Sequence, residues 1–536
     1  MSADTPSWGI EPVPERLRIL GFLDTFLLWG NLSVSLLVIV AGAFLVPALS
    51  LGGAFAAILV AGIVGNARLG VAGMIGADAR VPAMVVLRAP LGRRGSLLPT
   101  ALNVLQCLGW SVFELIIIAT AASALSQQVF GFGGKPLWTI VMGAIATGLA
   151  FMGPVGFVRR YVRKVAVYFV VASLAYLAWW AVHGQHVGAL WSKPGNGHDA
   201  FWPGVDLVLA SIVSWTPLAA DYTRFARDRR TAFWGVAIGY LLPTVGLFLL
   251  GAILMLTRDL GDAAAIPTAV AAGGLASILA LLALTVDESD EAFANVYSGA
   301  VSLQNAFPRA PQRLLIAGVA AVATAGALVI DLRNYQDFLF LLGAILMLTR
   351  DLGDAAAIPT AVAAGGLASI LALLALTVDE SDEAFANVYS GAVSLQNAFP
   401  RAPQRLLIAG VAAAATAGAL VIDLRNYQDF LFLLGSFFVP LFGVLLADWL
   451  LAGRHYDADV LFDGPAVRAE LIASWLAGFA LYQWLAPVGP SWWTSIVEHA
   501  HPSSLPFGGA SLPSFAAAFL LALAAGSVAR RRVVLA

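Results

Sequence analysis

Long apolar segments constrain this chain more than any other feature of its sequence. A helix needs roughly 18 to 25 mostly apolar residues to cross a bilayer. The chain is 60% hydrophobic and 12% charged, against about 25% charged residues in typical soluble proteins. We therefore expect an all-α polytopic membrane protein. Its spans lie near residues 20–47, 52–75, 98–126, 136–154, 164–184, 204–222, 232–255, 266–300, 313–331, 358–392, 405–423, 427–452, 466–487 and 512–530.

Two of these spans occur twice, because the chain contains a tandem duplication. Residues 247–343 recur at 339–435, an offset of 92 residues with one mismatch, Val322 against Ala414. Diverged repeats are typical of solenoids and of inverted-repeat transporters. Near-identity instead indicates a very recent duplication or a sequence-assembly error.

We expect one of the repeat units, 247–338 or 339–430, to be surplus within a single transporter domain of residues 1–536. Removing one unit leaves 444 of the 536 residues and twelve spans. With both units present, we expect about fourteen spans and a short re-entrant or interfacial piece at the internal junction.

Basic residues gather in alternate loops, and this pattern orients the spans. Both termini are expected in the cytoplasm, with the chain in the plasma (inner) membrane. The net charge of −2 does not suggest nucleic acid as a partner. The basic loops and tail contain Arg88, Arg93, Arg94, Arg159, Arg160, Arg163, Lys164, Arg224, Arg227, Arg229, Arg230, Arg309, Arg313, Arg454, Arg530, Arg531 and Arg532.

Charged and polar residues inside spans are expensive and often line a cavity or an ion path. The third span places Trp110 and Glu114 four residues apart on one helical face. In the eighth span, residues 285–291 interrupt an apolar run, and Asn295 follows. That interruption is either a solvated outer loop or a discontinuous helix whose oxygens bind sodium or a proton.

Two further spans carry features that favour broken helices. In the first span, Gly30 is followed by the polar residues Asn31 and Ser33, as an unwound segment requires. In the sixth span, Pro217 follows Ser214-Trp215-Thr216, and a proline inside a helix removes one backbone hydrogen bond.

Together these segments resemble the nucleobase:cation symporter family, the permeases for cytosine, purines, uracil, thiamine, allantoin and hydantoins. The resemblance implies a five-plus-five inverted-repeat, LeuT-like transporter with two appended helices. Within the family, residues 290–298 are most similar to the branch of hydroxymethylpyrimidine or cytosine transporters. The stretches that carry the resemblance are 28–35, 88–96, 109–114, 214–224 and 287–308.

The resemblance also implies a binding site, with the substrate ring stacked between Trp110 and Trp215. The substrate-binding candidates are Trp29, Trp110, Glu114, Ser214, Trp215 and Asn295, or Asn387 in the second copy. The cation-binding candidates are Asn31, Val34, Ser35, Val286, Ser289 and Asp290, or Val378, Ser381 and Asp382 in the second copy.

The sequence favours a secondary transporter that imports a 4-aminopyrimidine, such as hydroxymethylpyrimidine or cytosine, by sodium or proton symport. Glu114 replaces an amide of the hydantoin carriers, and a carboxyl group pairs well with an amino group beside a ring nitrogen. The alternatives are another nucleobase-type permease, a channel, or a non-functional product of the duplication. We expect no enzyme, because no nucleotide loop, GxSxG motif or histidine cluster occurs. We expect no cofactor, no nucleic acid and no obligate protein partner, only the substrate, its coupling ion and the bilayer.

Overall fold

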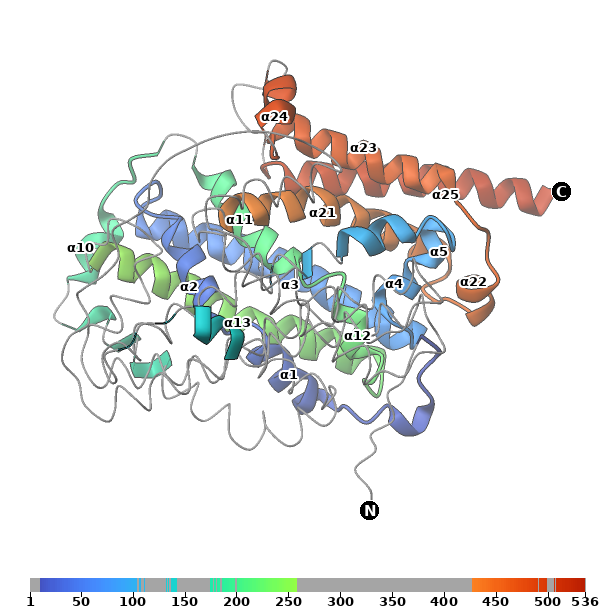
Figure 1. The fold of residues 1–536 in the computed structure, drawn as a ribbon, viewed down its shortest axis with the longest axis horizontal. Coiled ribbons are helices and arrows are strands. Elements are labelled where there is room, and N and C mark those ends of the chain that lie inside the picture. The colour runs from blue at the N-terminus through green and yellow to red at the C-terminus, as the bar shows by residue number, and fades with distance from the viewer. Residues whose placement is uncertain are drawn as a thin grey trace.

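The structure is a computed structural model of the 536-residue chain. It describes residues 10–103, 106–107, 110, 132, 134, 136–141, 174–176, 178–179, 181–183, 186–197, 200–257, 427–489, 491–498, 506 and 508–535. This part of the chain is helical, with one isolated parallel bridge between Leu20 and Ala226. Its elements (Figure 1) are η1 (Glu15–Leu17), α1 (Phe22–Asn31), α2 (Leu36–Ala43), α3 (Leu51–Ala79), α4 (Ala83–Val86), α5 (Arg88–Leu91), α10 (Val187–Ser192), α11 (Phe201–Val213), α12 (Ala219–Thr223), α13 (Arg229–Thr257), α21 (Tyr427–Leu451), α22 (Ala458–Phe462), α23 (Ala469–Leu485), α24 (Ser491–Glu498) and α25 (Ser511–Leu535).

Four helices of the described part, α3, α13, α21 and α25, are long and apolar enough to cross a membrane. They coincide with the spans expected near 52–75, 232–255, 427–452 and 512–530, and α23 coincides with the span near 466–487. Both copies of the eighth and ninth spans, and the internal junction of the duplication, lie outside the described residues.

The first span is broken at the position that the sequence predicted. Helix α1 ends at Asn31 and α2 begins at Leu36. Ser35 caps α2, because its Oγ accepts a hydrogen bond of 3.0 Å from the Leu37 N–H, one of the donors that a helix N-terminus leaves without an intrahelical partner.

The sixth span is broken as well. Helix α11 ends at Val213, residues 214–218 form turns around Pro217, and α12 begins at Ala219. The helices that follow the two broken spans, α3 and α13, both have 29 residues.

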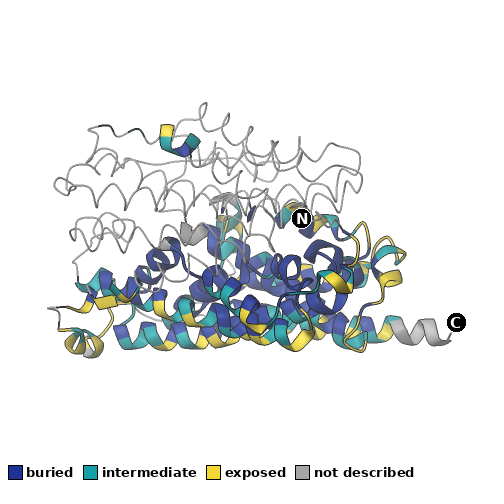
Figure 2. Cartoon of the chain, turned by 90° about the horizontal axis from the view of Figure 1, so that it is seen from below, coloured by how far each residue is buried: buried dark blue, intermediate teal, exposed yellow. Residues whose placement is uncertain are grey.

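The two broken spans pack with α3 and α13 into one bundle. Glycines permit the closest approaches. A Cβ at Gly76 of α3 would lie 2.5 Å from the Ala220 Cα of α12, and a Cβ at Gly251 of α13 would overlap the carbonyl of Ile39 in α2. Figure 2 shows buried residues in the interior of the described helices and exposed ones along their outer edge. Large apolar side chains that are exposed, such as Leu242 (59%) and Leu520 (61%), are those expected to face lipid.

Helices α21, α23 and α25 pack against one another, and α21 also contacts α11 of the bundle. A polar contact reinforces this joint. The buried carboxylate of Asp206 in α11 accepts hydrogen bonds from the backbone N–H groups of Ala510 (2.7 Å) and Ser511 (3.1 Å) at the start of α25. Asp206 therefore caps a helix that begins about 300 residues later in the chain.

Several basic loops expected in the cytoplasm meet at one end of the bundle. The backbone of Leu20 pairs with Phe225 and Arg227, with N–H to carbonyl distances of 3.1 and 3.0 Å. Arg18 donates from Nε to the carbonyl of Ala226 (3.1 Å) and from Nη2 to the carbonyl of Ala77 (3.3 Å). The N-terminal segment is thereby joined to the ends of α3 and of the sixth span.

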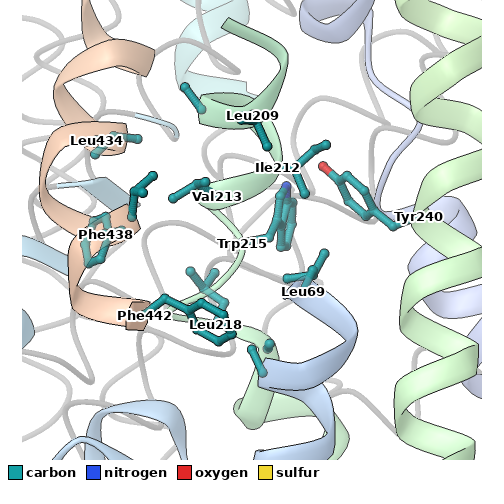
Figure 3. Close-up of a cluster of buried hydrophobic side chains, with 14 of the residues drawn as sticks. Leu69, Leu209, Ile212, Val213, Trp215, Leu218, Tyr240, Leu434, Phe438 and Phe442 are labelled. Carbon is teal, nitrogen blue, oxygen red and sulfur yellow. The ribbon is translucent and has the colours of Figure 1, made fainter. Parts of the chain in front are cut away.

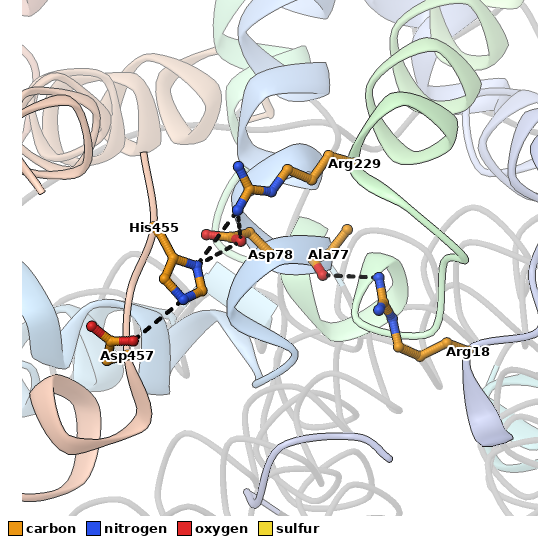
Figure 4. A network of polar contacts seen from close by, with 6 residues as sticks. All are labelled: Arg18, Ala77, Asp78, Arg229, His455 and Asp457. Atoms are coloured by element: carbon orange, nitrogen blue, oxygen red, sulfur yellow. Dashed lines mark hydrogen bonds and ion pairs between the residues drawn. The ribbon is translucent and has the colours of Figure 1, made fainter. Parts of the chain in front are cut away.

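A network of polar contacts among Asp78, Arg229 and His455 lies at the same end (Figure 4). Asp78 at the end of α3 is buried and pairs with Arg229 at the start of α13. His455, in the loop after α21, places Nδ1 2.9 Å from the same Asp78 oxygen and Nε2 3.4 Å from Asp457. The loops therefore share one end of the molecule, while the assignment of that end to the cytoplasm stays a prediction.

Candidate functional site

Trp215 lies at the break of the sixth span, immediately after Ser214, the C-cap residue of α11. Its side chain is 5% exposed. The ring of Trp29 lies 6.1 Å away at an interplanar angle of 77°, and that of Tyr240 lies 6.1 Å away at 56°. Figure 3 shows Trp215 beside Tyr240, among apolar side chains from α3, α11 and α21. These contacts give a residue in an irregular segment a defined orientation.

Trp29 supports Trp215 from inside the bundle. It is fully buried and also has edge-on contacts with Tyr222 (6.0 Å) and Tyr240 (6.1 Å). Its indole Nε1 has no hydrogen-bond partner in the described part of the structure. Sequence reasoning selected Trp29 and Trp215 as site residues but not the two tyrosines, which reach this cluster from α12 and α13. Tyr222 lies in the stretch 214–224 that carries the family resemblance, whereas no motif marked Tyr240.

Trp110 of the third span is also buried, with 7% of its side chain exposed. Its ring contacts Phe430 of α21 edge-on, with centroids 5.4 Å apart and an interplanar angle of 75°. The two tryptophans expected to bind the substrate therefore have different aromatic neighbours, Trp29 and Tyr240 beside Trp215 and Phe430 beside Trp110.

Gln106 connects the segments that carry these tryptophans. It lies one helical turn before Trp110, is fully buried, and donates from Nε2 to the carbonyl of Ser214 (2.8 Å) and to Asn103 Oδ1 (3.0 Å). Sequence reasoning did not select Gln106 as a site residue. The available signal was its position four residues before Trp110, which places both on one helical face.

The first-span half of the expected cation site lies at the break between α1 and α2. The Val34 N–H donates to the Asn31 carbonyl (2.9 Å) and the Ser33 hydroxyl to the Gly30 carbonyl (3.3 Å). Ser35 Oγ accepts from one N–H and keeps a second lone pair. Carbonyl and hydroxyl oxygens of this kind suit a hard cation. Within the described ranges, no three His, Cys, Asp or Glu side chains cluster as a metal site would require.

The other expected site residues lie outside the described residues. For the substrate these are Glu114, Asn295 and Asn387, and for the cation Val286, Ser289, Asp290, Val378, Ser381 and Asp382. The candidates that lie within the described residues are Trp29, Trp110, Ser214 and Trp215 for the substrate, and Asn31, Val34 and Ser35 for the cation.

Comparison with known families finds one match over most of the chain. The family described as "Permease for cytosine/purines, uracil, thiamine, allantoin" matches residues 12–358. The chain is 26% identical over 245 residues to a hydantoin permease of Microbacterium maritypicum, covering 42% of this chain and 49% of that protein. It is 24% identical over 253 residues to a purine-cytosine permease of Saccharomyces cerevisiae, covering 46% and 47%. The chain spans about half the length of these relatives.

Solved structures give the same fold at lower identity. Mhp1, a nucleobase-cation-symport-1 family transporter in a closed conformation with bromovinylhydantoin bound, is similar with a TM-score of 0.62 at 17% identity, covering 99% of this chain and 97% of that one. The inward-facing conformation of Mhp1 has a TM-score of 0.65 at 15% identity, covering 98% and 94%. The described helices therefore follow the fold of a helical membrane transporter.

Proposed function

The chain belongs to the family of permeases for cytosine/purines, uracil, thiamine and allantoin, and on that premise we propose that it imports a 4-aminopyrimidine by cation symport. Membership of the family and the transporter fold make it a membrane transporter rather than an enzyme. The proposal concerns its substrate, its coupling ion and its site.

The observation that carries the proposal is the arrangement of two buried tryptophans around the break of the sixth span. Trp110 and Trp215 lie on segments that the Gln106–Ser214 hydrogen bond joins. An aromatic surface binds a flat ring by stacking, which contributes roughly 1–3 kcal/mol per nucleic-acid base. Trp29, behind Trp215, takes part by keeping that ring in place.

The choice of an aminopyrimidine rests on Glu114. Its spacing of four residues from Trp110 predicts that both lie on one helical face. A carboxyl group there can accept from an amino group and, when protonated, donate to the adjacent ring nitrogen. Uracil and hydantoin lack that pairing. Glu114→Gln should weaken aminopyrimidine uptake, and undiminished uptake would remove this argument for the substrate class.

The coupling ion, sodium or a proton, is proposed to bind at the break of the first span. Asn31, Val34 and Ser35 supply oxygens there, and the eighth-span residues supply the rest. The broken first and sixth spans, each followed by a helix of 29 residues, suit the two halves of an inverted repeat that alternates access around a central site. The end that carries the basic loops is then cytoplasmic.

We also propose that one repeat unit is surplus. The five-residue string Leu-Phe-Leu-Leu-Gly occurs at both ends of the duplication and at its internal junction, at 247–251, 339–343 and 431–435. Its first and last copies lie inside the helices α13 and α21. Excising either unit leaves both helices with the same sequence, and the products differ only in Val322 or Ala414.

The test is uptake of labelled cytosine by cells that express the full chain, with excess unlabelled hydroxymethylpyrimidine, uracil, hypoxanthine or allantoin as competitors. The sodium and proton gradients are collapsed in turn. Gradient-dependent uptake that hydroxymethylpyrimidine blocks and allantoin does not is the expected result. Block by uracil, a purine or allantoin instead would assign another base, and gradient-independent flux would indicate a channel.

Variants connect this uptake to the site. Loss of stacking in Trp215→Ala should raise KM by roughly 5- to 150-fold, and Trp215→Phe should raise it less. Trp234→Ala is the control, because Trp234 of α13 is 47% exposed at the outer surface. If the full chain is inactive and deletion of one unit restores uptake, the surplus unit blocks the transporter. Inactivity of both forms would refute the proposed substrate.

A further inference from the structure

We propose that Gln106 is a positioning residue that holds the break of the sixth span and thereby sets the place of Trp215. The inference rests on the proposed function, because the position of Trp215 is what it is argued to control. Gln106 is fully buried and belongs to the third span, so it acts on the sixth span across 108 residues of sequence.

The break leaves the carbonyl of Ser214 without a helical partner. In a continuous helix this carbonyl would accept from the N–H of residue 218, and in a tighter turn from that of residue 217. Residue 217 is proline and has no N–H. The Leu218 N–H donates instead to the Trp215 carbonyl at 3.1 Å. Pro217 therefore both ends α11 and creates a buried acceptor.

The hydroxyl of Ser214 donates its hydrogen bond to the carbonyl of Ser211 (2.6 Å) and not to the Ser214 carbonyl. The Ser214 carbonyl instead accepts a hydrogen bond from Nε2 of Gln106 in the third span, at 2.8 Å. The same nitrogen donates to Asn103 Oδ1 at 3.0 Å. Two acceptors require the two protons of the amide nitrogen, which determines how the amide is turned.

The amide oxygen of Gln106 has no hydrogen-bond partner in the described part of the chain. Among the described residues, the two donated hydrogen bonds are therefore the polar contacts that orient the side chain. Trp215 is the residue directly after the carbonyl that Gln106 holds, and Trp110 is one turn after Gln106. The bond thus sets how the two tryptophan-carrying segments lie against each other.

Gln106→Glu tests this role through pH. A protonated carboxyl group can donate its O–H to the Ser214 carbonyl, whereas a carboxylate cannot. At pH 8 we expect a KM for cytosine about tenfold above that of the wild type, as loss of one buried hydrogen bond would give. The ratio of variant to wild-type KM should fall toward one by about pH 5, since a free glutamic acid titrates near 4.3 and burial raises that value. Gln106→Leu should be impaired at every pH.

The matched control is Gln483→Glu. Gln483 is also buried and donates from Nε2 to Ser436 Oγ at 3.2 Å, between α23 and α21. The ratio of the Gln483→Glu KM to the wild-type KM should not fall toward one as the pH is lowered from 8 to about 5. A pH-independent ratio for Gln106→Glu, or wild-type KM in Gln106→Leu, would overturn the inference.

A second measurement separates this inference from the proposed substrate. Thermal unfolding of the purified full chain in detergent needs no transported ligand. A melting temperature of Gln106→Glu that is lowered at pH 8 and restored in acid, relative to wild type, supports the Gln106–Ser214 bond even if cytosine is not taken up. An unchanged melting temperature at both pH values in a chain that transports no pyrimidine would refute both proposals.

Discussion

The Asp206 cap of α25 gives the most direct test of how the C-terminal helices are attached to the bundle. Asp206 is 2% exposed and accepts two backbone N–H hydrogen bonds, from Ala510 and Ser511. A carboxylate also interacts favourably with the positive end of the helix dipole. The loop residue Gly509, with φ of +63°, passes so close that an added Cβ would overlap the carboxylate.

Asp206→Ala leaves both N–H groups buried without an acceptor. Each buried donor left unsatisfied costs about 1–3 kcal/mol, and loss of a helix cap typically costs about 0.5–2 kcal/mol. Since part of the structure can relax, we expect a loss of about 2–4 kcal/mol in the free energy of unfolding. Asp206→Asn keeps one acceptor oxygen and should lose about half as much.

The assay is thermal unfolding of the detergent-purified chain by tryptophan fluorescence, together with limited proteolysis of α25, because loss of the cap should also favour local opening of that helix. Asp459→Ala is the control, since Asp459 is exposed on the short surface helix α22. The reasoning is refuted if Asp206→Ala melts at the same temperature as Asp459→Ala and α25 is cleaved no faster.

Three further predictions concern the bundle and its basic end. Arg229→Ala should lower the free energy of unfolding by about 1 kcal/mol, because Asp78 is buried but Arg229 is half exposed. A double-mutant cycle with His455→Ala should show that the two changes in unfolding free energy are coupled. Additive changes would exclude a shared cluster. Asp228 caps α13, and a backbone hydrogen bond from the first turn of that helix lowers its pKa below the ordinary 3.8. The cap therefore stabilises the fold above that pH, and the melting difference between Asp228→Ala and wild type should vanish as pH falls through the lowered value. Gly76→Val should lower the melting temperature and abolish uptake, because its side chain would overlap the backbone of α12; normal folding would show that α3 and α12 can separate.

Much of the architecture could be predicted from the sequence, because the relevant signals are local. Apolar length placed the spans that correspond to α3, α13, α21, α23 and α25 to within a few residues. Polar residues after Gly30 and the proline at 217 marked the two breaks. Hydrophobicity and the missing proline N–H act over a few neighbouring residues, so the chain alone reveals them.

The family resemblance selected the site residues of the first, third and sixth spans. Nothing local indicated what those residues would contact. That Trp29 and Tyr240 support Trp215, and that Phe430 supports Trp110, depends on the register in which separate helices pack.

Only the tertiary structure determined the long-range polar contacts between helices. Gln106 meets Ser214 across 108 residues, Asp206 meets Ala510 across 304, and His455 meets Asp78 across 377. In each case one residue satisfies a buried polar group of the other segment. Gln106 donates to the Ser214 carbonyl, Asp206 accepts from the N-terminus of α25, and His455 contacts the buried carboxylate of Asp78. A sequence can indicate which polar groups lack a local hydrogen-bond partner. Which distant side chain bonds to them depends on how the helices pack in three dimensions.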